Sequence, residues 1–206
     1  MTTNRYRAGS ALVREESGMR IVEEQVGEAL GAHATVPIAF EVTCRLRLEL
    51  VDRGLHGIRL IREPVDPPYV KDYDQEEHPL RWQETWDTRN WGLISALDGT
   101  RRAGGAVIAW RTAGVNMLRG RDDLAVLWDI RVHPGYRRQG VGRRLFAAAV
   151  DWARARECAD FLVETQNINV PACALYASMG CELAAISSFA YPRQPEEAQL
   201  LWRLRL

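Results

Sequence analysis

Hydrophobic and polar side chains alternate without a break over residues 38–50, which is the two-residue period of a half-buried β-strand. A second strand over residues 56–61 would pair back on the first, because Asp52-Arg53-Gly54 between them suits a chain reversal. Three prolines between residues 64 and 68 then predict an irregular segment up to Tyr69, since proline has no N–H for a sheet ladder.

Two more strands are expected over residues 91–97 and 106–111, joined by a loop that ends at Gly104-Gly105. Up to this point the pattern is that of an antiparallel meander. Residues 1–35, in contrast, are polar, contain several glycines and have only a weak helical pattern. We therefore expect a mobile arm or a loosely docked helix there, followed by a single domain over residues 36–206.

The second half of the chain combines strands with helices. Residues 124–132 are typical of a buried strand, and apolar residues then recur at helical spacing over residues 141–152. A strand over residues 161–165 precedes Asn169, which is expected to cap a helix with Pro171 in its first turn. Two closing strands are expected, over residues 182–190 and 198–202.

The charges of the chain balance, with 27 Lys and Arg against 27 Asp and Glu, so a long-range positive field for nucleic acid or an anionic membrane is absent. The four cysteines show no C-x-x-C spacing, which favours reduced thiols and a cytoplasmic location. The four histidines have no metal-ligand spacing, so no metal is expected. No apolar run approaches the ~20 residues that cross a bilayer. The function is therefore expected to lie in a local site.

One segment has the pattern of an anion site. The run Arg137-Arg138-Gln139-Gly140-Val141-Gly142 lies between a predicted strand and the first turn of a predicted helix. Glycines let the main chain approach a ligand, and a helix start offers unpaired N–H groups and about half a positive charge. Two phosphates would fit there, and Arg143 and Arg144 could serve further anionic charge. A dinucleotide fingerprint is disfavoured because Leu145 stands where its third glycine would be.

The loop also has partners in order along the chain. The run from Asp129 to Gly142, followed by Asn169-x-x-Ala172-x-x-Leu175-Tyr176, resembles the GNAT superfamily of N-acetyltransferases and its signature Arg/Gln-x-x-Gly-x-Gly/Ala. Residues 67–74, 164–173 and 197–202 are similar to streptothricin acetyltransferases. The resemblance implies an α/β (α+β) fold with a mixed, mostly antiparallel sheet of about six to seven strands and flanking helices. It also implies that acetyl-CoA lies where two central strands, residues 124–132 and 161–165, splay apart.

The resemblance further implies roles for individual residues. Backbone groups of Ile130 and Val132, with Arg131 between them, would hold the pantetheine arm and help polarise the thioester carbonyl. The loop of residues 137–142, with Arg143, would hold the pyrophosphate. The remaining residues that the resemblance assigns to the cofactor are Asn169 and Tyr176, and Tyr176 would protonate or hydrogen-bond the departing thiolate.

The proton of the acceptor amine is a separate problem. A lysine-like ammonium has a pKa near ~10.4, so its reactive form costs roughly 4.6 kcal/mol at neutral pH. Streptothricin acetyltransferases tend to carry Glu-Asp-Ile on this strand, where this chain has Trp128-Asp129-Ile130. Strand alternation predicts that Trp128 shares a face with Ile130 and Val132, while Asp129 points the other way with Arg131. Trp128 would then stack on a substrate or pack.

Asp129 and Glu164 are the candidate catalytic acids, and each could equally be a structural carboxylate paired to an arginine or a backbone N–H. A water chain to bulk solvent is the third proton route. The acidic residues of segment 72–77 would either line a mouth suited to a cationic amine or form a solvated loop.

Three functions remain open: acetylation of a small-molecule amine such as a streptothricin-like antibiotic, acetylation of a protein or peptide, and non-catalytic sensing of acetyl-CoA. Exposed edge strands would permit a homodimer.

Overall fold

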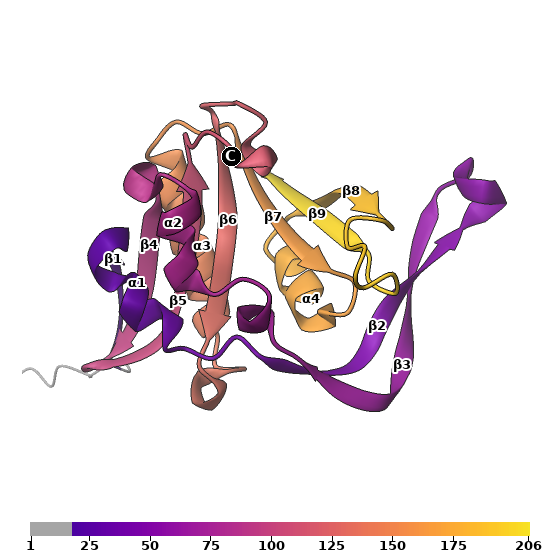
Figure 1. Ribbon diagram of the computed structural model, residues 1–206, viewed down its shortest axis with the longest axis horizontal. Coiled ribbons are helices and arrows are strands. Elements are labelled where there is room, and N and C mark those ends of the chain that lie inside the picture. The colour runs from indigo at the N-terminus through magenta and orange to yellow at the C-terminus, as the bar shows by residue number, and fades with distance from the viewer. Residues whose placement is uncertain (1–17) are drawn as a thin grey trace, which may run out of the picture.

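The computed structural model describes residues 18–206, and over this range it contains a seven-stranded sheet in the order β1-β4-β5-β6-β7-β9-β8 (Figure 1). Its strands are β1 (Met19–Glu24), β4 (Gly92–Asp98), β5 (Arg101–Trp110), β6 (Leu124–Val132), β7 (Asp160–Gln166), β8 (Glu182–Ser187) and β9 (Gln199–Arg205). All neighbouring strands of this sheet are antiparallel except β6 and β7. The predicted mixed, mostly antiparallel sheet is confirmed.

The parallel pair β6 and β7 is joined over only part of its length. Register pairs run from Leu124↔Asp160 to Leu127↔Val163, although β6 continues to Val132. From Glu164 on, β7 stays paired with β9 on its other side. The two central strands therefore diverge in the middle of the sheet, as the resemblance to the GNAT superfamily implies (Figure 1).

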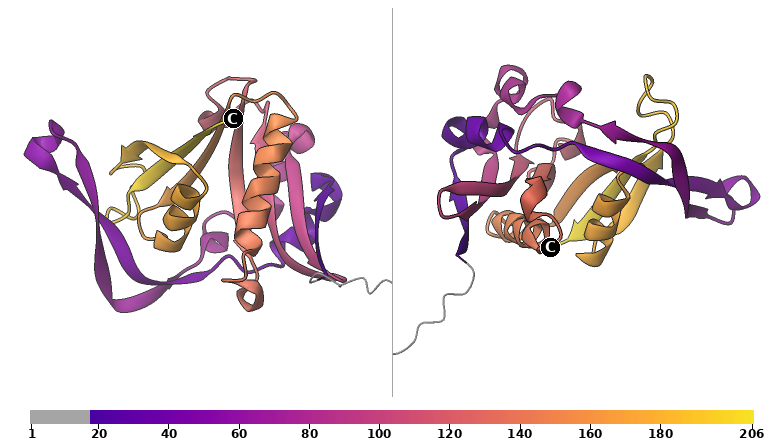
Figure 2. Two further views of the ribbon diagram at one scale, coloured as in Figure 1. Left: turned by 180° about the vertical axis from the view of Figure 1, so that it is seen from behind. Right: turned by 90° about the horizontal axis from the view of Figure 1, so that it is seen from below.

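Helices cover both faces of the sheet. α3 (Val141–Arg154) and α4 (Val170–Ser178) lie on one face, and α1 (Val26–Ala34) and the short α2 (Trp82–Thr85) lie on the other (Figure 2). The core under α3 includes the fully buried Phe146 and Phe161, whose rings meet edge to face at 5.6 Å. Each such side chain contributes roughly 1.5–3 kcal/mol on burial, so α3 fixes the position of the strand-loop-helix unit that begins with β6.

A second, two-stranded sheet extends away from the body of the molecule (Figure 1). β2 (Phe40–Leu50) and β3 (Ile58–Lys71) form the predicted hairpin. The prediction that the prolines end regular structure is wrong, because β3 continues through them. A register shift between Val42 and Cys44 places residues 65–68 in a bulge, where a missing N–H breaks no ladder bond.

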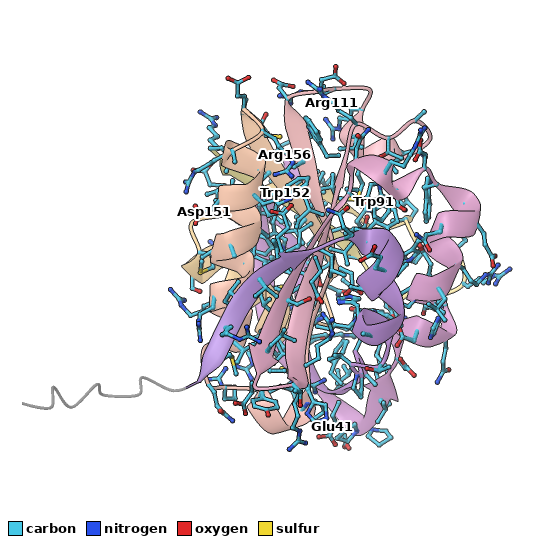
Figure 3. All side chains as sticks on the ribbon, turned by 90° about the vertical axis from the view of Figure 1, so that its left-hand side faces the viewer. Glu41, Trp91, Arg111, Asp151, Trp152 and Arg156 are labelled. Atoms are coloured by element: carbon cyan, nitrogen blue, oxygen red, sulfur yellow. The ribbon has the colours of Figure 1, made fainter. Side chains whose placement is uncertain are left out.

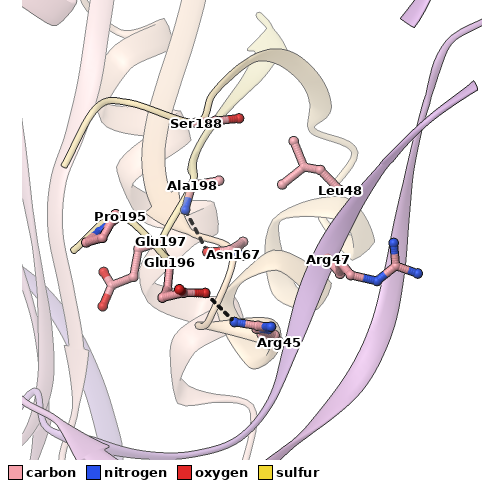
Figure 4. A pocket seen from close by; sticks show the side chains of 9 residues that line it. All are labelled: Arg45, Arg47, Leu48, Asn167, Ser188, Pro195, Glu196, Glu197 and Ala198. Atoms are coloured by element: carbon pink, nitrogen blue, oxygen red, sulfur yellow. Dashed lines mark hydrogen bonds and ion pairs between the residues drawn. The ribbon is translucent and has the colours of Figure 1, made fainter. Parts of the chain in front are cut away.

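Asn167, just after β7, fastens this ribbon to the main sheet. Its backbone carbonyl oxygen accepts a hydrogen bond from Leu46 N at 2.9 Å, and its side-chain Nδ2 donates to Leu46 O at 3.0 Å. The Asn167 side-chain oxygen accepts from Ala198 N at 2.8 Å, and Arg45 reaches Glu196 at 3.2 Å across a small pocket (Figure 4). The ribbon is thus held at the end of β7 that borders the splay.

The described part of the first 35 residues is integrated into the fold. The sequence predicts a mobile arm or a loosely docked helix, but β1 pairs with β4 along its length and Leu30 of α1 is only 2% exposed. Glu23 on β1 accepts a hydrogen bond from Trp152 of α3 at 2.8 Å, beside Arg156 (Figure 3). The helical pattern is weak because α1 is nine residues long. Residues 1–17 lie outside the described residues, and the domain boundary at residue 35 stays a prediction.

The pair Gly104-Gly105 lies inside β5, although the sequence predicts that it ends the loop between two strands. A Cβ at Gly105 would overlap the imidazole of His33, and a Cβ at Gly104 would overlap the carbonyl oxygen of Arg131. The glycines therefore allow close approach across the sheet instead of a turn.

Candidate active site

A cleft of about 1150 Å³ opens where β6 and β7 separate. It runs from the start of α3, along the free edge of β6, to a wall formed by α2, β7 and the segment before the 3-10 helix η3 (Pro79–Arg81). Its lining includes Tyr73, Glu76, Glu77, Trp82, Met117, Trp128, Asp129, Ile130, Arg131, Val132, Arg137, Arg138, Gly140, Val141, Gly142, Arg143, Glu164, Asn169, Tyr176 and Tyr191. One cavity therefore contains both an anion-binding end and an acidic, aromatic end.

The start of α3 forms the anion-binding end. Gly140 is the N-cap, with a left-handed φ of 82° and no side chain to cap the helix. The N–H groups of Val141 and Gly142 in the first turn are consequently free of a side-chain cap, and α3 adds its partial positive charge. A Cβ at Gly140 would meet no atom within 4 Å, so open space lies above the helix start. This geometry fits a pyrophosphate.

Some arginines around this loop bind backbone carbonyls and hold the loop in place, whereas others line the cleft. Arg137 donates to Val132 O at 3.0 Å and to Ala39 O at 2.9 Å, which fastens the loop to β6 and to the chain before β2. Arg144 donates to Met19 O and does not line the cleft. Arg138 and Arg143 line it, and Arg143 also donates to Ser178 Oγ at 2.8 Å. Two guanidinium groups therefore lie on the cleft at the start of α3, where they could pair with an anion.

The free edge of β6 lies between the two ends of the cleft. Beyond Leu127 it has no partner on the β7 side, so its backbone groups face the cavity. Val107 of β5 pairs with Asp129 and Ile108 pairs with Leu127, which leaves Trp128 as the extra residue of a β-bulge.

The bulge changes the predicted direction of side chains. Trp128 packs in the core on the α1 and α2 side, whereas Ile130 and Val132 pack in the core under α3. The prediction that Trp128 shares a face with Ile130 and Val132 is therefore wrong, because strict alternation fails at a bulge. The rings of Trp86, Trp91 and Trp82 surround Trp128, with centroids 4.8, 5.3 and 6.4 Å away. These four residues form what we call the tryptophan wall.

Asp129 lies at the centre of a buried ion network. His33 of α1 donates from Nε2 to Asp129 Oδ1 at 2.7 Å, and Arg131 donates to both carboxylate oxygens at 2.9 and 2.7 Å. Burial alone would raise the pKa of Asp129, but the hydrogen bonds from Arg131 and His33 outweigh it and hold this pKa well below its usual range. Asp129 is thus a paired, ionised carboxylate.

Arg131 extends this network to the acidic segment 72–77. Its guanidinium donates to both carboxylate oxygens of Asp74 at 3.1 Å. Asp72 accepts from Asp74 N, and Glu76 pairs with Lys71 at 2.6 Å. Most of the acids in the segment are therefore structural; Glu76 and Glu77 both line the cleft, and of these two only Glu76 is held in an ion pair.

Three tyrosines border the splay. Tyr191 donates to Glu164 Oε1 at 2.6 Å. Tyr176 of α4 is 3% exposed, and burial raises its pKa. The hydroxyl of Tyr73 is buried and has no hydrogen-bond partner among the described residues, and burial raises its pKa as well. Phenols in this setting stay protonated and available as donors.

The structure brings the residues that the sequence singles out to this cleft. The candidates Tyr176, Asp129 and Glu164 all line it, as do the residues assigned to the cofactor, except that Gln139 turns away and donates to Gly135 O. Sequence reasoning missed Tyr191 and His33, which carry no motif. The segment containing Tyr73 and Glu77 was recognisable from its clustered acids and tyrosines.

Among residues 18–206 there is no group of three or more His, Cys, Asp or Glu side chains arranged to hold a metal ion. Within that range no helix is long and apolar enough to cross a membrane.

Known proteins share this architecture. Residues 58–181, more than half of the chain, match the acetyltransferase (GNAT) family. Streptothricin acetyltransferase of Escherichia coli is 30% identical over 187 residues, covering 88% of this chain and 92% of that protein. The [ribosomal protein bS18]-alanine N-acetyltransferase of Escherichia coli (strain K12) is 32% identical over 130 residues, covering 63% and 84%.

A solved structure extends the likeness to the site. A protein of Bacillus anthracis str. Ames, crystallised in complex with acetyl coenzyme A, superposes with a TM-score of 0.71 at 28% identity and covers 91% of this chain and 99% of its own. In this chain the start of α3 and the splay between β6 and β7 lie on one cleft. This chain belongs to the GNAT family and is an acetyl-CoA-dependent acetyltransferase.

Proposed function

We propose that the protein transfers the acetyl group of acetyl-CoA to a primary amine of a small cationic molecule, with streptothricin-like antibiotics as the substrate class. The observation that carries the proposal is the single cleft that joins the α3 cradle to a wall of tryptophans and carboxylates. An anionic co-substrate and a cationic acceptor are thereby drawn to opposite ends of one cavity. The similarity to streptothricin acetyltransferase over 88% of the chain supports this substrate class.

The end of the cleft at α3 would bind acetyl-CoA and orient its thioester. The N–H groups of Val141 and Gly142, with Arg138 and Arg143, would hold the phosphates, and Asn169 would border the same arm. Backbone groups on the free edge of β6 at Ile130 and Val132 would hold the pantetheine chain. Acetyl-CoA supplies the thioester carbonyl that the amine attacks.

Tyr176 would act on the departing sulfur. Because burial raises its pKa, the phenol is a weaker acid than in water, and full proton donation to a thiolate becomes more unfavourable. Its O–H remains a donor at every physiological pH. We therefore assign Tyr176 a hydrogen bond to the developing thiolate, which stabilises the charge as it forms.

Asp129 would orient the site without accepting the proton. Its carboxylate already pairs with Arg131 and His33, and its lowered pKa makes it a poor base. Glu164 accepts a hydrogen bond from the Tyr191 hydroxyl and lines the cleft. Its negative charge would stabilise the cationic acceptor.

Initial rates of thiol release test this function. Streptothricin, 1,5-diaminopentane and a peptide that begins with alanine would each be incubated with the protein and acetyl-CoA. The proposal predicts the highest kcat/KM for streptothricin. Preference for the peptide would support protein acetylation, the activity named for the ribosomal-protein relative. Binding of acetyl-CoA without release against any amine would indicate the sensing function.

A further inference from the structure

We propose that Glu77 is the carboxylate that receives the ammonium group of the acceptor and takes its proton before the amine attacks. This rests on the proposed function, since it names the base of the same reaction. On β6, Trp128 carries no carboxylate and that of Asp129 is already paired with Arg131 and His33, so the acid is supplied instead from the segment that precedes η3 (Pro79–Arg81).

The pairing of the other acids singles out Glu77. Four carboxylates line the cleft: Glu76, Glu77, Asp129 and Glu164. Glu76 is paired with Lys71 at 2.6 Å, Asp129 with Arg131 at 2.7 Å, and Glu164 accepts from Tyr191 at 2.6 Å. Within residues 18–206 the Glu77 side chain forms no ion pair, and the donor near it is the neutral indole N–H of Trp82. A cation entering the cleft can therefore pair with Glu77 without displacing another cation.

The surroundings of Glu77 suit an alkylammonium ion. Trp82 and Trp128 of the tryptophan wall line the same cavity, as does Met117. Aromatic faces bind ammonium groups through cation–π attraction, worth about 0.5–2 kcal/mol. The indole N–H of Trp82 is buried and has no partner among the described residues, and the Trp82 indole is close enough to lower the pKa of Glu77. The Trp82 indole N–H is therefore available to donate a hydrogen bond to a polar group of the acceptor or to the Glu77 carboxylate.

The charges around Glu77 adjust its basicity. Although Glu77 is exposed to solvent, the protein atoms around it partly desolvate its carboxylate and raise its pKa above the ordinary value; the Trp82 indole N–H lowers this pKa, and the carboxylates of Asp129 on β6 and Glu164 on β7 raise it again. Arg81 on η3 acts in the opposite direction. A carboxylate with a raised pKa accepts a proton from an ammonium ion at a smaller energetic cost than an ordinary one.

The step balances. The ammonium gives one proton to a Glu77 carboxylate oxygen and becomes a neutral amine. The amine nitrogen attacks the thioester carbonyl carbon, the C–N bond forms, and the C–S bond breaks. The nitrogen loses its second proton, which the sulfur takes to become the free thiol. Glu77 then returns its proton to solvent through the open cleft. No oxidant, reductant or metal enters.

The test compares Glu77→Gln with wild type and with Glu84→Gln, which removes the same charge from an exposed position on α2 outside the cleft. For each protein, kcat/KM for streptothricin would be measured from pH 6 to pH 10, with acetyl-CoA affinity determined by calorimetry. Glu77→Gln is expected to lose about 10²-fold or more in kcat/KM at pH 7 while acetyl-CoA affinity stays unchanged.

The pH profile separates a base from a structural residue. For wild type and Glu84→Gln, kcat/KM should not change with pH between the pKa of Glu77 and the pKa of the amine. Glu77→Gln should depend on free amine, so its kcat/KM should rise about tenfold per pH unit toward the amine pKa of ~10.4. A Glu77→Gln profile that matches wild type in height and shape would overturn the assignment of Glu77 alone. Absence of thiol release by wild type would overturn the proposed function instead. Loss of acetyl-CoA affinity by Glu77→Gln would also refute the proposal, because the carboxylate would then support the fold.

Discussion

His33 and Asp129 are 96 positions apart in the sequence, yet His33 Nε2 lies 2.7 Å from Asp129 Oδ1. The histidine is completely buried, and Gly105 of β5 leaves room for its ring. Arg131 then joins Asp129 to Asp74. One network therefore links α1, β6 and the acidic segment 72–77.

Removal of the imidazole should weaken the fold. His33→Ala deletes a hydrogen bond to an ionised, buried carboxylate and leaves a cavity beside Gly105. We expect the free energy of unfolding to fall by about 2–4 kcal/mol. Urea denaturation followed by tryptophan fluorescence measures the change.

His56 provides the matched control. It pairs with Asp52 at 3.1 Å, but its side chain is 71% exposed. His56→Ala should change the free energy of unfolding by no more than about 0.5 kcal/mol. Equal effects of the two substitutions would show that the buried network does not stabilise the fold.

Acid should weaken the same network. Because hydrogen bonds hold the pKa of Asp129 below its unfolded value of ~3.9, this group contributes stability that is fully present above about pH 5 and is lost as pH falls toward its folded pKa. The difference in free energy of unfolding between wild type and Asp129→Asn, measured from pH 7 to pH 3, should therefore narrow on acidification. A constant difference would mean that Asp129 does not titrate in the unfolding transition.

The second half of the fold follows closely from the sequence. The apolar run of β6, the helical spacing of α3 and the cap at Asn169 are all where they are predicted, because local propensity and burial agree there. Gly140 has a left-handed φ, which explains a glycine at the helix start. Those elements fix the cofactor end of the cleft.

The errors lie where tertiary contacts override local pattern. Trp128 faces the opposite side because of a bulge that alternation cannot reveal. β3 passes through its prolines because Pro67 and Pro68 lie in another bulge, while Pro64 stays in register with Cys44. His33 is a single histidine on a short helix, and only its approach to Gly105 shows its importance. The acceptor end depends on such long-range contacts, so the sequence alone left its base open.

The cradle at α3 can be tested by adding bulk. Gly140→Val would place a side chain in the open space above the helix start, so acetyl-CoA affinity should fall at least about tenfold. Gly99→Val is the control, because Gly99 also has a positive φ and open space around it but lies in the β4–β5 turn. Both variants should lose stability from backbone strain, roughly 1–2 kcal/mol. If calorimetry finds that Gly140→Val and Gly99→Val bind acetyl-CoA with equal affinity, the start of α3 is not part of the binding site.

Tyr176 can be tested without altering shape. Tyr176→Phe removes one hydroxyl, so kcat should fall about 10²-fold while acetyl-CoA affinity is nearly unchanged. Tyr69→Phe, at an exposed position of β3, should leave both quantities as in wild type. Stopped-flow and steady-state rates provide the comparison, and an undiminished kcat in Tyr176→Phe would exclude the phenol from the reaction.

The central claim is that one cleft joins acetyl-CoA to a small cationic amine. Mass spectrometry of streptothricin after incubation with the protein and acetyl-CoA, with free thiol measured in the same sample, tests it most directly. The account predicts a mass increase of one acetyl group on streptothricin and one equivalent of free coenzyme A per product. Thiol release without an acetylated amine, or unchanged streptothricin beside intact acetyl-CoA, would contradict it.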